Sequence, residues 1–232
     1  MKKLIFVMAA AILGLSQSAK AQTNLQTFYD FGREHVTTTL EMFKGDNFGN
    51  TFFFVDYDYA TKNTPSGTYM EIARCINLWQ DSKLGALSLQ VEYNGGLGIF
   101  ELPAGYGGFG VNSAFLGGLD YFLHSSDFSN TLNLKVLYKN IRNTAQQVPL
   151  QLTAVWGCQN ILGLKGLNFS GFADVWWESK CVFISEPQLW YNVGQHFGVD
   201  NLNIGGEVEF SYNFAGVDGF KCRPCLGTKW VF

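Results

Sequence analysis

The chain alternates apolar and polar residues over many short segments. In LSLQVEYN, residues 87–94, Leu87, Leu89 and Val91 fall on one face of an extended strand and the polar residues between them on the other. The same period of two runs through TLNLKVLYKN, residues 131–140, and LNIGGEVEFSYNF, residues 202–214. Alternation of this kind predicts β-strands with one apolar and one polar face.

Turn signals divide the chain into about twelve candidate strands, the first at residues 25–31 and the last at residues 220–232. An even number of strands is typical of bacterial outer-membrane barrels. Most connections between the candidate strands are short and polar. Residues 95–110, GGLGIFELPAGYGGFG, are predicted instead to form one long loop. Counting the strands from the N-terminus places this loop outside the cell.

The composition argues against an ordinary soluble protein. Hydrophobic residues make up 47% of the chain and charged residues 15%, against roughly 25% charged residues in soluble domains. So few charges cannot cover a surface that faces water, and no later run of about 18 apolar residues could cross a membrane as a helix. We therefore predict an all-β fold, an antiparallel transmembrane β-barrel of about 12 strands. The alternative is a soluble secreted β-sandwich or barrel.

The N-terminus predicts export. MKK is followed by the apolar stretch LIFVMAAAILGL, and the Ala19-Lys20-Ala21 tripeptide fits a signal peptidase site. We expect residues 1–21 to be a cleaved signal peptide and residues 22–232 to form the barrel. The expected location is the outer membrane of a Gram-negative cell.

The chain finishes on an aromatic residue. Phe232 shares one strand face with Trp230 and Thr228, so we expect it to be the last lipid-facing position of the last strand. A C-terminal aromatic in this pattern resembles the signature that the outer-membrane assembly machinery recognises. The predicted partners are this machinery, the membrane lipids and a small-molecule solute, and we expect a monomer.

Catalytic and metal chemistry have weak support. Cys222 and Cys225 are three residues apart on one strand, so they point to opposite faces and fit neither a disulfide nor a shared metal ion. His124 and Ser125 resemble the base and nucleophile of an outer-membrane lipid hydrolase, but they lie in a turn-like segment. We predict no enzyme, no metal and no cofactor, and keep the hydrolase as an alternative.

Three segments carry a family resemblance. LEMFKGDNFGNTFFFVDYDY at residues 40–59, YMEIAR at residues 69–74 and GFADVWW at residues 171–177 resemble the Tsx-like nucleoside-specific channels of Gram-negative outer membranes. They are still more similar to a Tsx-related family of unassigned function. The resemblance implies a narrow, monomeric, twelve-stranded channel that passes nucleosides by diffusion.

The lumen can be predicted from the residues alone. In TFFFVDYDY, residues 51–59, apolar side chains at the odd positions suit lipid, which turns Phe52, Phe54 and Asp56 inward. An aromatic ring beside a carboxylate suits a nucleoside, whose base stacks and whose ribose offers hydroxyl groups. Phenylalanines that only fill space explain the pattern equally well. The candidate solute-binding residues are Phe52, Phe54, Asp56, Glu41, Glu71, Glu92, Asp120, Asp174 and Trp176.

Charge refines the expected solute. The inward acids outnumber the inward bases Lys135 and Lys139, so phosphorylated solutes should be disfavoured and neutral or cationic ones admitted. The net charge of −3 and the lack of a basic stripe give no reason to expect nucleic acid. One position conflicts: if Glu71 faces the lumen, Arg74 falls on the lipid side and needs a bulge or snorkelling.

The sequence therefore predicts an outer-membrane channel for passive diffusion of nucleosides or similar small neutral solutes. The alternatives are a structural or general small-solute barrel with a plugged lumen and, less favoured, the lipid hydrolase.

Overall fold

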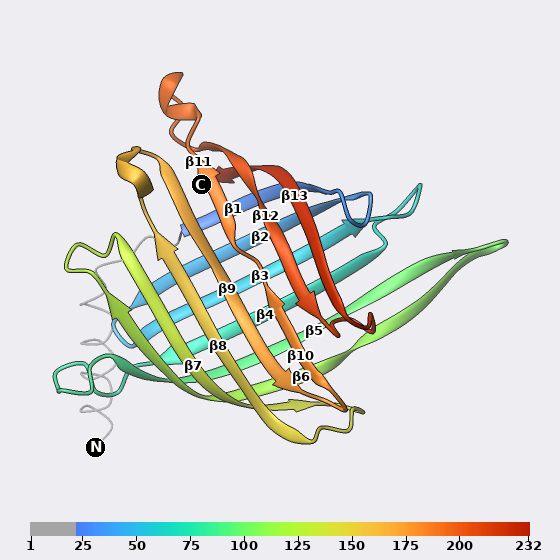
Figure 1. Cartoon of the computed structure of the whole chain (residues 1–232), viewed down its shortest axis with the longest axis horizontal. Helices are drawn as coiled ribbons and strands as arrows, with labels where there is room; N and C mark the ends of the chain where they lie inside the picture. Colours follow the sequence, from blue (N-terminus) through green and yellow to red (C-terminus); the bar gives the residue numbers. More distant parts are fainter. Residues whose placement is uncertain (1–21) are drawn as a thin grey trace, which may run out of the picture.

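The computed structural model describes residues 22–232, and the expected signal peptide at residues 1–21 lies outside this range. These residues form one antiparallel sheet that closes into a barrel, because β1 at one end pairs with β13 (Figure 1). Two short 3-10 turns, η1 (Ile161–Gly163) and η2 (Gly194–His196), lie in connections. The strands are β1 (Gln22–Asp30), β2 (His35–Asp46), β3 (Gly49–Tyr59), β4 (Gly67–Ile76), β5 (Leu87–Leu102), β6 (Gly105–His124), β7 (Asn130–Ile141), β8 (Val148–Cys158), β9 (Leu167–Trp177), β10 (Cys181–Ser185), β11 (Gln188–Tyr191), β12 (Leu202–Tyr212) and β13 (Phe220–Val231).

Two of these segments are halves of one strand. Both β10 and β11 pair with β9 on one side and β12 on the other. The break falls at Glu186 and Pro187, where proline has no N–H to donate to a ladder. The carbonyl of Pro187 still accepts a hydrogen bond from the N–H of Val208 at 3.1 Å, which keeps the strand attached. The barrel therefore has twelve strands, as predicted.

The alternation predicted from sequence sets the two faces of the wall. On β1, Asn24, Gln26 and Phe28 point inward and are buried, whereas Leu25 and Tyr29 point outward and are 41% and 43% exposed. A polar interior and an apolar exterior reverse the pattern of a soluble protein and suit a wall that faces hydrocarbon. Within residues 22–232, no helix is long and apolar enough to cross a membrane.

The C-terminal aromatic residues lie where the sequence placed them. Trp230 pairs with Leu25 and Leu202, two outward-facing residues of the neighbouring strands. Phe232 follows on the same face with 68% exposure, and its N–H donates to the carbonyl of Thr23 at 2.9 Å. The lipid-facing parity of the last strand is thus confirmed. Recognition of Phe232 by an assembly machinery stays a prediction.

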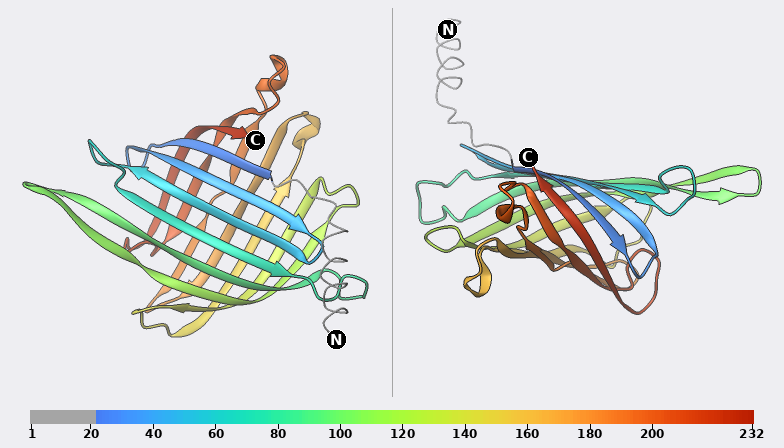
Figure 2. Two further views of the ribbon diagram at one scale, coloured as in Figure 1. Left: turned by 180° about the vertical axis from the view of Figure 1, so that it is seen from behind. Right: turned by 90° about the horizontal axis from the view of Figure 1, so that it is seen from above.

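The long loop predicted at residues 95–110 is wrong. β5 and β6 continue as paired strands to Leu102 and Gly105, and the hairpin projects far beyond the rest of the barrel in every view (Figures 1 and 2). Glycines hid the strand signal because they contribute no side chain to the alternation. Two of these gaps are filled from across the ladder, where the ring of Phe109 lies over Gly98 and that of Phe100 over Gly107.

Arg74 lacks the bulge that was one of its two expected remedies. Its strand pairs with β3 and β5 without a register shift, so no bulge turns it away from the outer face. Its guanidinium instead donates two hydrogen bonds to the carboxylate of Asp46 at the end of β2, at 2.7 and 2.9 Å. A bidentate ion pair beside the β2–β3 turn neutralises this charge.

Candidate functional site: the barrel interior

Three neighbouring strands bring the central candidate residues together inside the barrel. Glu41 on β2 pairs with Phe54 on β3, which pairs with Glu71 on β4, and paired residues share a face. The ring centroids of Phe52 and Phe54 are 6.1 Å apart. Sequence reasoning missed Tyr69, whose ring centroid lies 6.1 Å from that of Phe54 and which pairs with Asp56. We name the aromatic–acidic patch by its members, Glu41, Phe52, Phe54, Asp56, Tyr69 and Glu71.

The carboxylates of the aromatic–acidic patch accept hydrogen bonds from uncharged groups only. Among residues 22–232, no Lys or Arg forms an ion pair with Glu41, Asp56 or Glu71. These carboxylates are therefore held in place by hydrogen bonds and not by a direct ion pair, and lone pairs remain free for a solute. The donors are Asn24 to Glu41 at 2.9 Å, Thr39 to Asp56 at 2.5 Å, and Tyr69 and Asn94 to Glu71 at 2.8 and 3.0 Å.

Glu92 and Asp174 extend the acidic surface around the lumen. Glu92 lies on β5 and accepts a hydrogen bond from Gln90 at 2.6 Å. Glu71 is close enough to both Glu92 and Asp174 to interact with their charges. Asp174 belongs to β9, which strands β5 to β8 separate from the strand of Glu71. Carboxylates from two distant parts of the wall therefore converge, so the lumen is narrow.

Trp176 and Asp120 lie apart from the aromatic–acidic patch. Trp176 is 7% exposed, its indole N–H donates to Glu178 at 2.9 Å, and the ammonium of Lys139 sits 3.8 Å from its ring centroid. Asp120 is 3% exposed and its two oxygens accept from the amide of Asn133 at 2.8 and 2.9 Å. Both side chains are occupied by neighbours of the wall and have little capacity for a solute.

A second group of inward charges joins Glu209, which period two places inward, to two bases that sequence reasoning missed. Glu209 on β12 accepts from Arg33, from Arg223 at 2.5 Å and from Ser211 at 2.7 Å. Arg33 also donates to Asp30 at 2.6 Å. Alternation counted back from Phe232 places Arg223 on the inner face. Arg33 lies in the β1–β2 turn, where residues do not alternate between two faces, so the sequence could not predict its orientation.

Lys229 is a further inward base that the same parity would have found. Its ammonium lies 4.4 Å from the ring centroid of Trp190 and 3.3 Å from the side-chain oxygen of Gln188. With Arg33, Arg223 and Lys229 added, acids still outnumber bases inside the barrel. The interior is therefore negative, and its paired charges are concentrated around Glu209.

Apolar side chains fill part of the interior. Leu137 is 0% exposed and packs with Ala114 and Leu116, and a neighbouring cluster contains Trp176 and Ile184. Both clusters contact Ile141, so they form one continuous apolar surface on β6 to β10. This surface faces the lumen and narrows it further.

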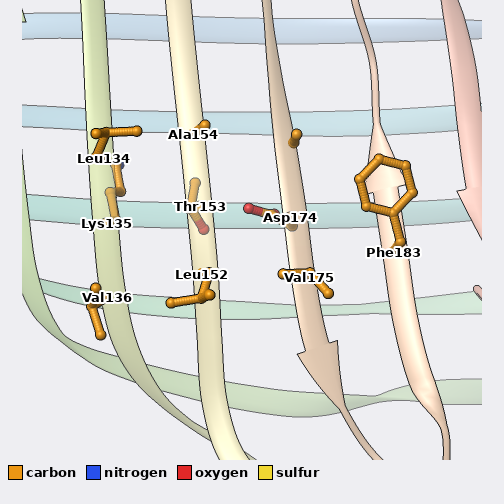
Figure 3. A pocket seen from close by; sticks show the side chains of 10 residues that line it. Leu134, Lys135, Val136, Leu152, Thr153, Ala154, Asp174, Val175 and Phe183 are labelled. Carbon is orange, nitrogen blue, oxygen red and sulfur yellow. The ribbon is translucent and has the colours of Figure 1, made fainter.

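An open apolar groove of about 590 Å³ lies on the outer wall rather than in the lumen. Figure 3 views it from outside: Leu134, Leu152 and Phe183 lie in front of the strands, while Lys135 and Asp174 point behind them. Its outward side chains are apolar, which suits lipid hydrocarbon. The groove is therefore part of the exterior surface and separate from the candidate site.

A family profile described as "Domain of unknown function (DUF5020)" matches residues 21–232, almost the whole chain. The chain belongs to this family. No curated protein matches the chain.

Solved structures with a similar fold include the KdgM porin in complex with disordered oligogalacturonate, at 10% identity and a TM-score of 0.53, covering 91% of this chain and 99% of that one. The Acinetobacter baumannii outer membrane protein Omp33 is similar at 11% identity and a TM-score of 0.42, covering 93% of this chain and 99% of that one. At such identity the likeness to KdgM shows the fold alone, so this DUF5020 protein has a porin-like barrel.

The hydrolase alternative requires a base beside its nucleophile, and the DUF5020 barrel does not pair them. The ring of His124 stacks on Phe128, with centroids 4.0 Å apart, and the hydroxyl of Ser125 donates to Asp127 at 2.6 Å. This bond and those from the hydroxyl and N–H of Ser129 lower the pKa of Asp127 to about 2. Ser125 therefore serves the β6–β7 turn.

The cysteines add no metal or redox centre to the DUF5020 barrel. Cys225 pairs with Asp30 and Glu207 on the inner face, whereas Cys222 pairs with Phe210 on the outer face. The predicted opposition of these two thiols is confirmed. Across residues 22–232, no cluster of His, Cys, Asp and Glu side chains could hold a metal ion.

Proposed function

We propose that this protein is a passive outer-membrane channel for small neutral solutes, with nucleosides as the preferred class. The observation that carries the proposal is the aromatic–acidic patch, in which neighbouring aromatic rings lie beside carboxylates that accept hydrogen bonds only from uncharged donors. The resemblance to Tsx-like channels and the porin-like fold support the same function.

The chemistry of a nucleoside matches the aromatic–acidic patch in two ways. The base offers a flat face to Phe52, Phe54 or Tyr69, and stacking on an aromatic side chain contributes about 1–3 kcal/mol per base. The ribose hydroxyls and the amino groups of bases can donate to Asp56 and Glu71. Such binding is strong enough to admit a solute and weak enough to release it, which a channel needs.

The excess of carboxylates over basic groups in the lumen argues against anionic solutes. An oligogalacturonate, the ligand in the KdgM structure, is a polyanion, and a nucleotide carries a charged phosphate. Both would be repelled by Glu71, Glu92 and Asp174, because these three carboxylates outnumber the ammonium of Lys139 that interacts with them. We therefore propose a different solute class for this barrel.

The apolar outer wall supports the proposed location in an outer membrane. Exposed Leu, Val, Phe and Tyr side chains occupy the outward positions of the strands, a surface that water would not tolerate at this size. The terminal Phe232 supports delivery there by the assembly machinery.

Swelling of liposomes that contain the refolded protein tests the proposal. Adenosine and thymidine should enter faster than a sugar of similar size, and a nucleotide should enter slowest. Changing Phe52→Leu, Phe54→Leu and Asp56→Asn together should remove the preference for nucleosides. The matched control is Phe53→Leu, which alters the neighbouring ring on the outer face. Equal entry of adenosine and the sugar through the unaltered protein would refute nucleoside selectivity.

A plugged barrel is the second candidate, because the apolar surface around Leu137 and Ile184 fills part of the lumen. Single-channel conductance separates the two candidates. A channel gives stepwise currents in planar bilayers, whereas a plugged barrel inserts without conducting.

A further inference from the structure

We propose that Phe100 and Phe109, on the projecting β5–β6 hairpin, form an outer capture site for solutes with a planar ring. This inference rests on the proposed function and extends it beyond the lumen. It follows from the register of the hairpin, the exposure of the two rings and their continuity with the aromatic–acidic patch.

A bulge in β6 decides which way Phe109 faces. Asn94 pairs with Ala114, but Gly96 already pairs with Val111, so two residues of β6 lie opposite Gly95. On the barrel side of the bulge, the even-numbered residues of β6, including Ala114, face the lumen. Between the bulge and the hairpin tip, the odd-numbered residues lie on the inner face, and Phe109 is one of them. On β5 the pairing with β4 is unbroken, so Phe100 keeps the inward parity of Asn94.

The rings of Phe100 and Phe109 are exposed and not buried in a core. Each lies over a glycine of the opposite strand, within 2.4 Å of where a Cβ of Gly98 or Gly107 would be. One face of each ring is thus covered by backbone, and the rings remain 58% exposed at Phe109 and 48% exposed at Phe100. A flat, fixed and half-covered ring is the arrangement on which another planar ring stacks.

Phe100 and Phe109, the two capture rings, lie on the same face of the sheet as the aromatic residues of the lumen. Gly98, under the ring of Phe109, pairs with Gly67 on β4, and Gly96 pairs with Tyr69 of the aromatic–acidic patch. Tyr69 in turn lies beside Phe54. The inner face therefore carries rings from the hairpin to the lumen, and a ring-bearing solute can pass from one to the next.

The root of the hairpin is held in place at the rim. The N–H of Ile99 donates to the carbonyl of Ser66 at 2.7 Å, and the backbone N–H of Lys62 donates to the carboxylate of Glu101 at 3.0 Å. Both bonds join β5 to the β3–β4 loop. The capture rings are thus fixed relative to the barrel mouth.

Adenosine binding to the full barrel in lipid nanodiscs tests the capture site directly. In protein with isotope-labelled phenylalanine rings, adenosine should shift the NMR signals of Phe100 and Phe109, and mannitol should not. Phe100→Leu keeps apolar cover over Gly107 but removes the π-face. It should weaken adenosine binding at Phe109 roughly fivefold, the loss of one stacking partner.

The matched control is Tyr106→Leu, which removes an aromatic ring from the opposite face of the same hairpin. It should leave adenosine binding at Phe109 unchanged. Unmoved Phe100 and Phe109 signals, or equal weakening by Phe100→Leu and Tyr106→Leu, would overturn the capture site. Adenosine uptake into liposomes by the unaltered protein judges the proposed channel separately, because hairpin binding does not require an open lumen.

Discussion

The ion pairs of Glu209 allow a quantitative test of how much paired charges on the inner wall stabilise the barrel. The Glu209 side chain is 4% exposed and that of Arg223 14%, so water screens this pair little. Replacing Arg223 with Met removes one charged donor and retains the packing of the side-chain stem. Glu209 then keeps Arg33 and Ser211 as donors.

The expected loss follows from these remaining partners. A hydrogen bond to a charged group contributes about 1.5–3 kcal/mol, and a buried charge left wholly unpaired costs about 3–5 kcal/mol. Because Arg33 stays with Glu209, Arg223→Met should lower the free energy of unfolding by about 2 kcal/mol. In the double variant with Glu209→Gln, the charge that needed Arg223 is gone, so the two losses should be less than additive by about 1–2 kcal/mol.

Equilibrium unfolding in urea, with the barrel in lipid vesicles, measures the free energy of unfolding of the unaltered protein, the two single variants and the double variant. The control is Lys180→Met, which breaks an ion pair with Asp218 whose side chains are 57% and 79% exposed. That variant should lose less than about 1 kcal/mol. Additive effects of Arg223→Met and Glu209→Gln, or an Arg223→Met loss no larger than that of Lys180→Met, would refute the reasoning.

Two further predictions concern a glycine and a turn. Gly205→Ala places a methyl group 2.0 Å from the carbonyl oxygen of Leu189 and should lower the free energy of unfolding by about 1–3 kcal/mol. Gly110→Ala, with nothing within 4 Å, should change it by less than about 0.5 kcal/mol in the same urea assay, and equal effects would contradict the clash. The pKa of Asp127 is below its ordinary value, so its contribution to stability is complete above about pH 3.8 and is lost as the pH falls through about 2. An NMR titration should therefore give a midpoint near pH 2 for Asp127, and Ser125→Ala should raise it; an unchanged midpoint would contradict the role given to Ser125.

Much of the candidate site was predictable because neighbours in a ladder share a face. Once Phe54 is taken as inward, period two places Phe52 and Asp56 beside it on the same strand. The sequence could not show that Glu41 and Glu71 flank Phe54, because that depends on the register of three strands. Tyr69 was missed although the same period predicts it, because it lies two residues before Glu71, which was already predicted to face inward.

The failures have specific physical causes. Residues 95–110 were predicted as a loop because glycine contributes no side chain to the alternation, although its backbone pairs like any other. Arg33 was missed because a turn residue has no parity, and its inward position depends on Asp30 and Glu209. Asn133 donates to both oxygens of Asp120, and contact of Asp120 with a solute stays a prediction.

The sequence by itself determined the barrel class, the strand number and the inward or outward side of most residues. These properties follow from local alternation and from a composition too poor in charge for water. The tertiary structure alone decided which inward residues meet and where the parity changes. A single bulge in β6 opposite Gly95 reverses the parity of the β6 residues between it and the hairpin tip, including Phe109, and nothing local in the sequence marks that change.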